Sequence, residues 1–202
     1  MKKRKKHAEN IRQQILEAAM QVYTDRGIEK TSIRNIVEII GYSPAAVYFY
    51  FKNKAEIMFA LHIKGFTELK RRFEVLHSVK NPLERLKAMG RAYIQFSFDY
   101  PALYDLMFVS EYPMKHLMEG NEPLWRQGEA TFDELRQTVA GCIRQGYFPG
   151  HDVEALSFLI WSMVHGMVSL HNSGRSEKAQ IATPQDIVML SYGEFERMMD
   201  RL

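Results

Sequence analysis

Residues 31–54 have the sequence TSIRNIVEIIGYSPAAVYFYFKNK. Ser32 is a favourable N-cap for a short helix that ends at Gly41, because glycine readily adopts the left-handed backbone of a helix end. Ser43 followed by Pro44 predicts the start of another short helix, since proline is favoured at the first helical position. Two short helices joined by a tight turn are typical of a helix-turn-helix, whose second helix can lie in the DNA major groove.

The rest of the chain is also predicted to be helical, which gives an all-α fold class. Apolar residues at three- and four-residue spacing predict a first helix that ends at Gly27. A capping residue followed by proline recurs at Asn81-Pro82 and Thr183-Pro184, and Pro101 is expected to break or kink a helix. The later helices are expected at about residues 54–77, 82–100, 124–147, 153–172 and 185–201, with a loop over 112–123.

Charge is distributed unevenly along the chain. Residues 1–54 hold eleven Lys and Arg against five Asp and Glu, which gives +6. Residues 55–202 hold sixteen against nineteen, which gives −3, so the two parts add up to the net charge of +3. The sequence therefore predicts a basic domain over 1–54 that meets a polyanion, and a second domain over 55–202. The basic run Lys2–Lys6 is expected to be disordered when free, and either to contact DNA or to remain a solvated tail.

The stretch from Thr31 to Ile57 resembles the DNA-binding signature of the TetR family of repressors. The resemblance includes the turn glycine at 41, the run Tyr48-Phe-Tyr-Phe and the lysine at 54 that opens the next helix. It implies an all-α protein with an N-terminal helix-turn-helix domain and a C-terminal helical bundle that binds a ligand and dimerises. The expected function is that of a ligand-responsive transcriptional repressor which binds double-stranded DNA as a homodimer.

The same resemblance implies a set of DNA contacts, position by position. Ser32, Tyr48 and Lys54 would bind phosphates, and Arg34 would bind a guanine, whose O6 and N7 match a guanidinium. Many members of the family have histidine where Tyr50 stands, so we expect Tyr50 to pack in the core of the head. The full set of expected DNA-binding residues is Ser32, Arg34, Ser43, Pro44, Ala45, Ala46, Tyr48, Phe49 and Lys54.

Two C-terminal segments predict a dimer. The segment Val153–Asn172 is apolar almost all round, so one side is expected to face its own core and the other a partner. The last helix carries a heptad-like apolar stripe suited to a helical bundle. Such a dimer would place two DNA-binding heads roughly 34–36 Å apart, on successive turns of a palindromic operator. The expected dimer residues are Val188, Tyr192, Phe195, Met199 and Leu202.

Trp161, His165 and Gly166 resemble the Trp-His-Gly signature in the C-terminal domain of one TetR subgroup. Trp161 and His165 lie four residues apart on one helical face, where His165 either contacts a ligand or packs in the core. The aromatic positions of this domain either form a core or line a pocket. Because few charges lie among them, the expected effector is a small apolar or aromatic molecule. The expected ligand-binding residues are Tyr93, Phe96, Tyr100, Tyr104, Met107, Phe108, Trp125, Phe132, Trp161 and His165.

Other classes of protein are less well supported by the sequence. The single Cys142 cannot form an intramolecular disulfide, which is typical of a cytoplasmic protein. The most apolar stretch, residues 155–170, is shorter than the roughly twenty residues that span a bilayer, so no membrane association is expected. Neither an enzyme motif nor a cofactor or metal motif is visible, so we expect no enzyme, cofactor or metal. An architectural DNA-binding protein without an effector is the alternative, although residues 55–202 are more than a dimer clamp needs.

Overall fold

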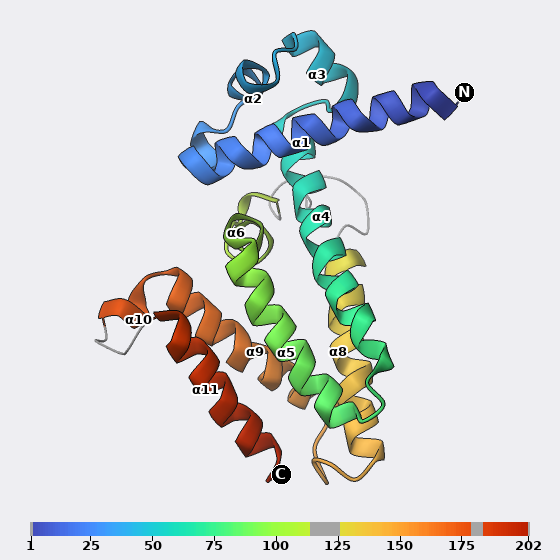
Figure 1. Ribbon diagram of the computed structural model, residues 1–202, viewed down its shortest axis with the longest axis vertical. Helices are drawn as coiled ribbons and strands as arrows, with labels where there is room; N and C mark the ends of the chain where they lie inside the picture. Colours follow the sequence, from blue (N-terminus) through green and yellow to red (C-terminus); the bar gives the residue numbers. More distant parts are fainter. Residues whose placement is uncertain (1, 114–125, 179–183, 202) are drawn as a thin grey trace. The chain divides into compact units, whose positions relative to one another are not determined.

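The computed structural model describes residues 2–113, 126–178 and 184–201 (Figure 1). Every regular element among these residues is a helix, so the predicted all-α fold class is confirmed. Trp125 and Leu202, two of the expected site residues, lie outside the described residues. The helices are α1 (Lys2–Lys30), α2 (Ile33–Ile40), α3 (Pro44–Tyr50), α4 (Lys54–Val75), η1 (Leu76–Ser78), α5 (Pro82–Asp99), α6 (Pro101–Phe108), α8 (Arg126–Arg144), α9 (Val153–Asn172), α10 (Arg175–Lys178) and α11 (Pro184–Met199).

The predicted helix ends are confirmed where local capping determines them. The Ser32 hydroxyl accepts from the Asn35 backbone N–H at the start of α2, and Gly41 ends that helix with a φ of 70°. The Ser43 hydroxyl accepts from the Ala46 N–H at the start of α3, with Pro44 at the first helical position. These bonds satisfy backbone groups that a helix end leaves without an intrahelical partner.

The N-terminal basic run differs from the prediction. We expected Lys2–Lys6 to be disordered, whereas α1 begins at Lys2. Lysine and arginine are good helix formers, and neither glycine nor proline separates this run from the apolar part of the helix. Gly27 has non-helical angles, φ 74° and ψ 176°, which confirms the predicted break in the helix.

The chain folds as two compact units, residues 1–65 with 102–124, and residues 66–101 with 125–202. The predicted boundary after residue 54 falls at the start of α4, whereas the units divide within α4. α6 also belongs to the first unit, although it directly follows α5 of the second unit. The sequence did not predict this, because α6 joins the first unit through contacts with segments distant in the chain.

The first unit has a continuous apolar core. The core joins α1, α2, α3, the start of α4 and Leu106 of α6. α6 is also attached by polar contacts, since the Tyr23 hydroxyl donates to Asp105 and His62 Nδ1 lies 3.4 Å from the Leu106 carbonyl oxygen. Burial and the Asp105 carboxylate both raise the pKa of Tyr23, so its phenol stays protonated and remains a donor.

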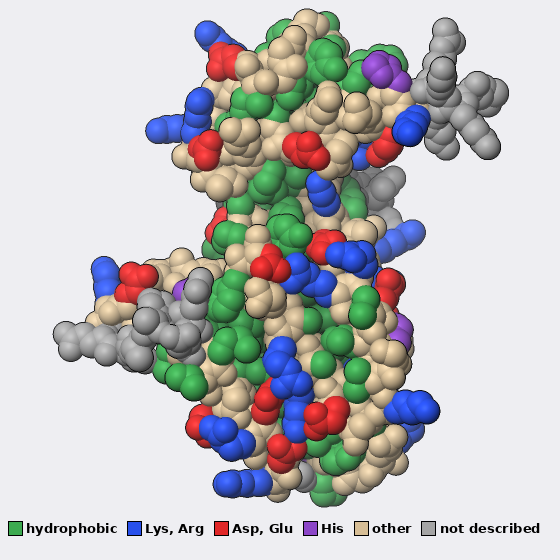
Figure 2. Space-filling model, in the orientation of Figure 1, with side chains coloured by type: hydrophobic (Ala, Val, Ile, Leu, Met, Phe, Trp, Pro, Cys, Tyr) green, Lys and Arg blue, Asp and Glu red, His purple; other side chains and the backbone are tan. Residues whose placement is uncertain are grey.

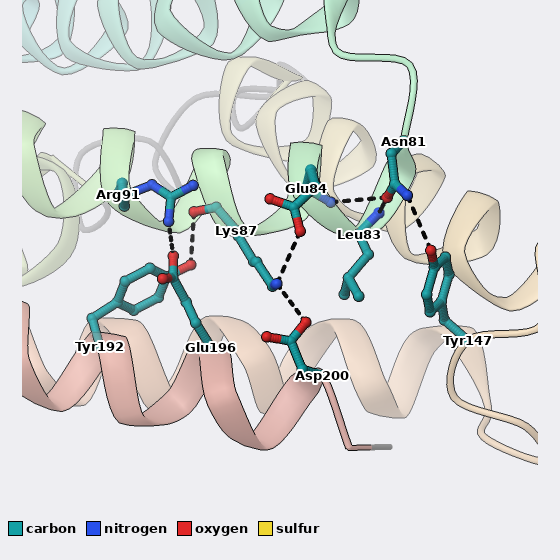
Figure 3. A network of polar contacts seen from close by, with 9 residues as sticks. All are labelled: Asn81, Leu83, Glu84, Lys87, Arg91, Tyr147, Tyr192, Glu196 and Asp200. Carbon is teal, nitrogen blue, oxygen red and sulfur yellow. Dashed lines mark hydrogen bonds and ion pairs between the residues drawn. The ribbon is translucent and has the colours of Figure 1, made fainter.

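The second unit is a bundle in which α5 packs against α8, α9 and α11 (Figure 1). α5 and α11 are also joined by polar contacts (Figure 3). Lys87 on α5, with 8% of its side chain exposed, lies 2.9 Å from Glu84 and 2.5 Å from Asp200 on α11. Arg91 pairs with Glu196, and Figure 2 shows such basic and acidic side chains interleaved over α5 and α11. These contacts fix how α11 lies along α5.

The length of α9 corrects one expectation. α9 has 20 residues, and among the described residues it is long and apolar enough to cross a membrane by length and composition. The helix extends beyond the apolar stretch 155–170, because Asp152 caps its start by accepting from the Ala155 N–H. α9 packs against α5, α8 and α11, as a core helix of a folded domain does.

Candidate nucleic-acid interface

α3 separates cleanly into a buried side and an exposed side. Val47 is fully buried, and Phe51 just after the helix is 3% exposed, so both fix α3 against the core of the head. Tyr48 is 54% exposed and Phe49 is 81% exposed, together with exposed Pro44 and Ala45. The residues expected to face DNA therefore lie on the free side of the helix. The exception is Ala46, which is half-buried.

Tyr50 connects the exposed side of α3 to the core. It is half-buried and packs against the core of the first unit, as we expected. Its ring contacts the Phe49 ring edge-on, with centroids 5.2 Å apart and an angle of 81° between planes. The exposed Phe49 ring is therefore held by a neighbour that itself is anchored.

The two residues at α2 that are expected to contact DNA, Ser32 and Arg34, differ in whether their side chains are already engaged within the protein. The Ser32 hydroxyl is already engaged with Asn35 as the helix cap. The Arg34 side chain is 89% exposed and lies 3.3 Å from Glu38 one turn later. Exposed ion pairs of this kind are weak, so Arg34 is available to a stronger anionic or guanine partner.

Lys54 makes contacts within the protein that the sequence did not predict. Its Nζ donates to the Ile28 carbonyl at the end of α1 and is 4.9 Å from the centre of the Tyr112 ring. Burial lowers the pKa of Lys54 despite the nearby Glu29 carboxylate. The ammonium group thus fastens the start of α4 to the head, and Ile28 and Tyr112 give it a structural role that spacing alone could not show.

Comparison with known proteins agrees with this geometry. Residues 15–61 match the domain described as bacterial regulatory proteins, tetR family, and residues 86–202 match the tetracyclin repressor-like C-terminal domain. The chain belongs to the TetR family. It is a DNA-binding transcriptional regulator of the class that includes repressors, and the family resemblance of residues 31–57 is confirmed.

Relatives of this TetR-family chain match it over most of its length. The probable HTH-type transcriptional regulator ArpR of Pseudomonas putida is 26% identical over 186 residues, 83% of each chain. The HTH-type transcriptional regulator RutR of Escherichia coli K12 is 25% identical over 151 residues, 73% of this chain and 69% of that protein. Among solved structures, the TetR family regulator PfmR from Thermus thermophilus has a TM-score of 0.67 at 22% identity, over 91% of this chain and 97% of that one. That structure supports the fold alone.

The described ligand residues expected for this TetR-family protein are divided between the two compact units. Tyr104 and Met107 are buried, and both belong to the first unit with Phe108, which contacts Tyr104. Phe96 and Tyr100 belong to the second unit, where their ring centres lie 5.7 and 5.2 Å from the guanidinium of Arg72. The sequence did not indicate this cation, because Arg72 comes from α4.

A second aromatic group of the same unit does come together. The Tyr93 hydroxyl lies 3.0 Å from His165 Nδ1, and the Trp161 and His165 ring centres lie 5.8 Å apart. Phe132 on α8 adds a further ring, 5.8 Å from Trp161. Burial lowers the pKa of His165, so the imidazole is neutral near pH 7. Four of the ten expected ligand residues are therefore neighbours around α9.

A groove of about 550 Å³ lies between α4 and α8, and it contains none of the expected ligand residues. Its charged residues are Lys70, Arg71, Glu74 and Arg126. Three of them already pair on α4, as Lys70–Glu74 and as Arg71 with Glu68. Within the described ranges no group of three His, Cys, Asp or Glu is placed to hold a metal ion.

The expected dimer stripe lies inside its own subunit, which corrects the sequence prediction. Val188, Tyr192, Phe195 and Met199 are each at most 9% exposed within the single chain. They pack where α11 meets α5 and α9. An apolar stripe shows that a helix has a buried side, but not whether its own subunit or a partner covers it.

A different apolar surface is exposed on the same two helices, which pack side by side. We call it the α9–α11 apolar face. Gly166 on α9 adds to it, since a Cβ there would meet nothing within 4 Å. Its large residues, each at least 40% exposed, are Phe158, Leu159, Met163, Leu170, Met189, Leu190 and Met198.

Proposed function

We propose that the chain is a dimeric, ligand-responsive repressor that grips a palindromic operator and is released from it by a small apolar or aromatic effector. The observation that carries this proposal is the exposed side of α3, held by the capped turn of the helix-turn-helix. The basic charge of residues 1–54 provides attraction for the DNA backbone. Ser32, Arg34, Ser43 to Ala46, Tyr48, Phe49 and Lys54 are the proposed contacts, with Lys54 acting mainly through the position of α4.

A second copy of this chain is the proposed partner of the α9–α11 apolar face. Leu159, Met163 and Leu170 lie at spacings of four and seven residues, so they share one side of α9 with Gly166. A glycine on that side lets a partner helix approach closely. Pairing α9 and α11 with their copies makes a four-helix interface and holds two heads at one separation.

The proposed effector site includes the aromatic group around α9. Tyr93, Phe132, Trp161 and His165 combine apolar rings with one hydroxyl and one neutral imidazole. This chemistry suits a small aromatic ligand that carries a hydrogen-bonding group. Tyr104, Met107, Phe108 and the pair Phe96 and Tyr100 remain proposed contributors.

The proposed release mechanism is a shift between two states. α4 has residues in both compact units, so a change of its orientation would move the head. An effector that favours the state with wrongly spaced heads lowers operator affinity. A hundredfold loss of affinity corresponds to about 2.7 kcal/mol of coupling.

The test is a binding titration on DNA flanking the gene of this protein, combined with light scattering. We expect one dimer for each palindromic fragment, with affinity that falls steeply as salt increases. A compound that stabilises the protein to heat should also release the fragment, which an architectural protein without an effector would not show. A monomer at micromolar concentration that ignores every fragment at low salt would refute the proposal.

A further inference from the structure

The exposed side of α3 carries an apolar stripe. Ala45 and Phe49 are four residues apart, so their side chains are neighbours along the helix. Both are exposed, and Phe49 at 81% is the most exposed of the large apolar side chains described in the chain. A phenyl ring presented in this way to a groove provides contact area but no hydrogen bond.

Few hydrogen-bonding groups surround this stripe. Among the exposed residues Pro44, Ala45, Tyr48 and Phe49, only Tyr48 has a polar side-chain atom. The Ser43 hydroxyl accepts from the Ala46 N–H as the helix cap. Ala45 and Phe49 themselves therefore offer a base no side-chain hydrogen bond of the kind that arginine forms with guanine.

The major groove offers one apolar feature that such a surface can recognise. Thymine places its C5-methyl group there, whereas guanine, cytosine and adenine present only donors and acceptors. The Phe49 ring is also oriented in advance, since it contacts the half-buried Tyr50 edge-on. A side chain that is already fixed loses little conformational freedom on binding.

We propose that Phe49, together with Ala45, recognises thymine C5-methyl groups on the major-groove edge of the operator. The proposal rests on the proposed function, because it requires α3 to lie in the groove. It makes Phe49 a specificity-determining residue and places thymines at fixed positions of each half-site. Arg34, on α2, is left to recognise guanine or phosphate elsewhere in the half-site.

Deoxyuridine provides the decisive probe, because it pairs as thymidine does and lacks only the methyl group. Duplexes of about 30 base pairs, long enough for two half-sites, are selected from a random library with the full chain. Each thymidine of a selected duplex is then replaced in turn by deoxyuridine, in both half-sites together. Affinity is measured by fluorescence anisotropy for the wild-type chain and for Phe49→Ala.

At one or two symmetric positions we expect the wild-type affinity to fall about fourfold per buried methyl group, or about fifteenfold for both half-sites. Phe49→Ala should bind the thymidine duplex more weakly and should no longer distinguish it from the deoxyuridine duplex. Ile39→Ala, at an exposed apolar residue of α2, is the matched control and should keep the wild-type discrimination. Unchanged thermal unfolding of both variants shows that the head remains folded.

Two results overturn the inference while leaving DNA binding intact. One is a wild-type chain that binds every deoxyuridine duplex as tightly as the parent duplex. The other is a Phe49→Ala variant that keeps the full discrimination. If no duplex is selected from the library at all, the proposed function fails as well, so the two failures are distinguishable.

Discussion

Replacement of Gly90 by alanine is expected to destabilise the second unit, because α5 and α11 approach closely there. A Cβ at Gly90 would lie 1.9 Å from the Tyr192 hydroxyl oxygen and 2.4 Å from the ring carbon that carries it. Tyr192 has little room to retreat, since it is 2% exposed and its hydroxyl donates to the Lys87 carbonyl at 2.9 Å (Figure 3). The methyl group must therefore displace α11 or break that hydrogen bond.

The expected magnitude follows from three contributions. Overpacking a well-filled core costs about 1–3 kcal/mol, and the hydrogen bond of Tyr192 contributes about 1 kcal/mol. Alanine is a better helix former than glycine by about 1 kcal/mol, which offsets part of this loss. The free energy of unfolding of Gly90→Ala should therefore fall by about 1–3 kcal/mol.

Urea denaturation followed by circular dichroism measures this change, at one protein concentration because the proposed dimerisation would contribute to stability. Gly141→Ala is the matched control, since Gly141 is also within a helix, α8, but a Cβ there would lie 3.4 Å from the nearest atom, Pro82 Cβ, which is an ordinary van der Waals contact. It should be as stable as the wild type or up to about 1 kcal/mol more stable. Tyr192→Leu should partly remove the penalty of Gly90→Ala in the double variant. A Gly90→Ala protein at least as stable as Gly141→Ala would refute the close approach.

Three further predictions concern the dimer, the pH dependence and the thiol. Gly166→Leu should leave each subunit folded but shift light scattering from dimer to monomer, whereas Gln137→Leu, which places the same apolar side chain on an exposed position of α8, should not. Equal dimerisation of both variants would contradict the proposed face. Burial lowers the pKa of His165, so the unfolded chain takes up a proton below about pH 6.5 where the folded chain does not, and stability falls as pH falls. His165→Gln should flatten this dependence between about pH 7 and pH 5, and urea titrations with an identical slope for both proteins would show the reasoning to be wrong. Burial raises the pKa of Cys142 to about 11, so a thiol reagent at neutral pH should label it only after urea unfolds the chain.

The features that sequence predicts well are those determined by residues close together in the chain. The caps at Ser32 and Ser43 depend on a bond to the backbone three residues later, so the sequence alone locates α2 and α3. The sequence also predicts which side of α3 is exposed, because Val47 and Phe49 are on opposite sides of one short helix.

The features that sequence did not predict depend on distant partners. Tyr23 and Asp105 are 82 residues apart, and Lys54 meets a carbonyl 26 residues earlier. α11 has apolar residues on two sides, and its heptad-like stripe gave no information on which side faces α5. Packing contacts with distant helices, such as that of Tyr192 against Gly90, determine that Val188, Tyr192, Phe195 and Met199 are internal.

The polar contacts between α5 and α11 bear on the proposed dimer. Burial alone would lower the pKa of Lys87, but the carboxylates of Asp200 and Glu84 outweigh it and raise that pKa, so the ammonium stays charged and bonded to α11. Because Tyr192 and the Arg91–Glu196 pair hold the same two helices, α11 cannot rotate without breaking several contacts together. A helix held in this way would present Met189 and Leu190 to the proposed second copy in one fixed orientation. The separation of two DNA-binding heads would then depend on α5 as much as on the residues that touch the second copy.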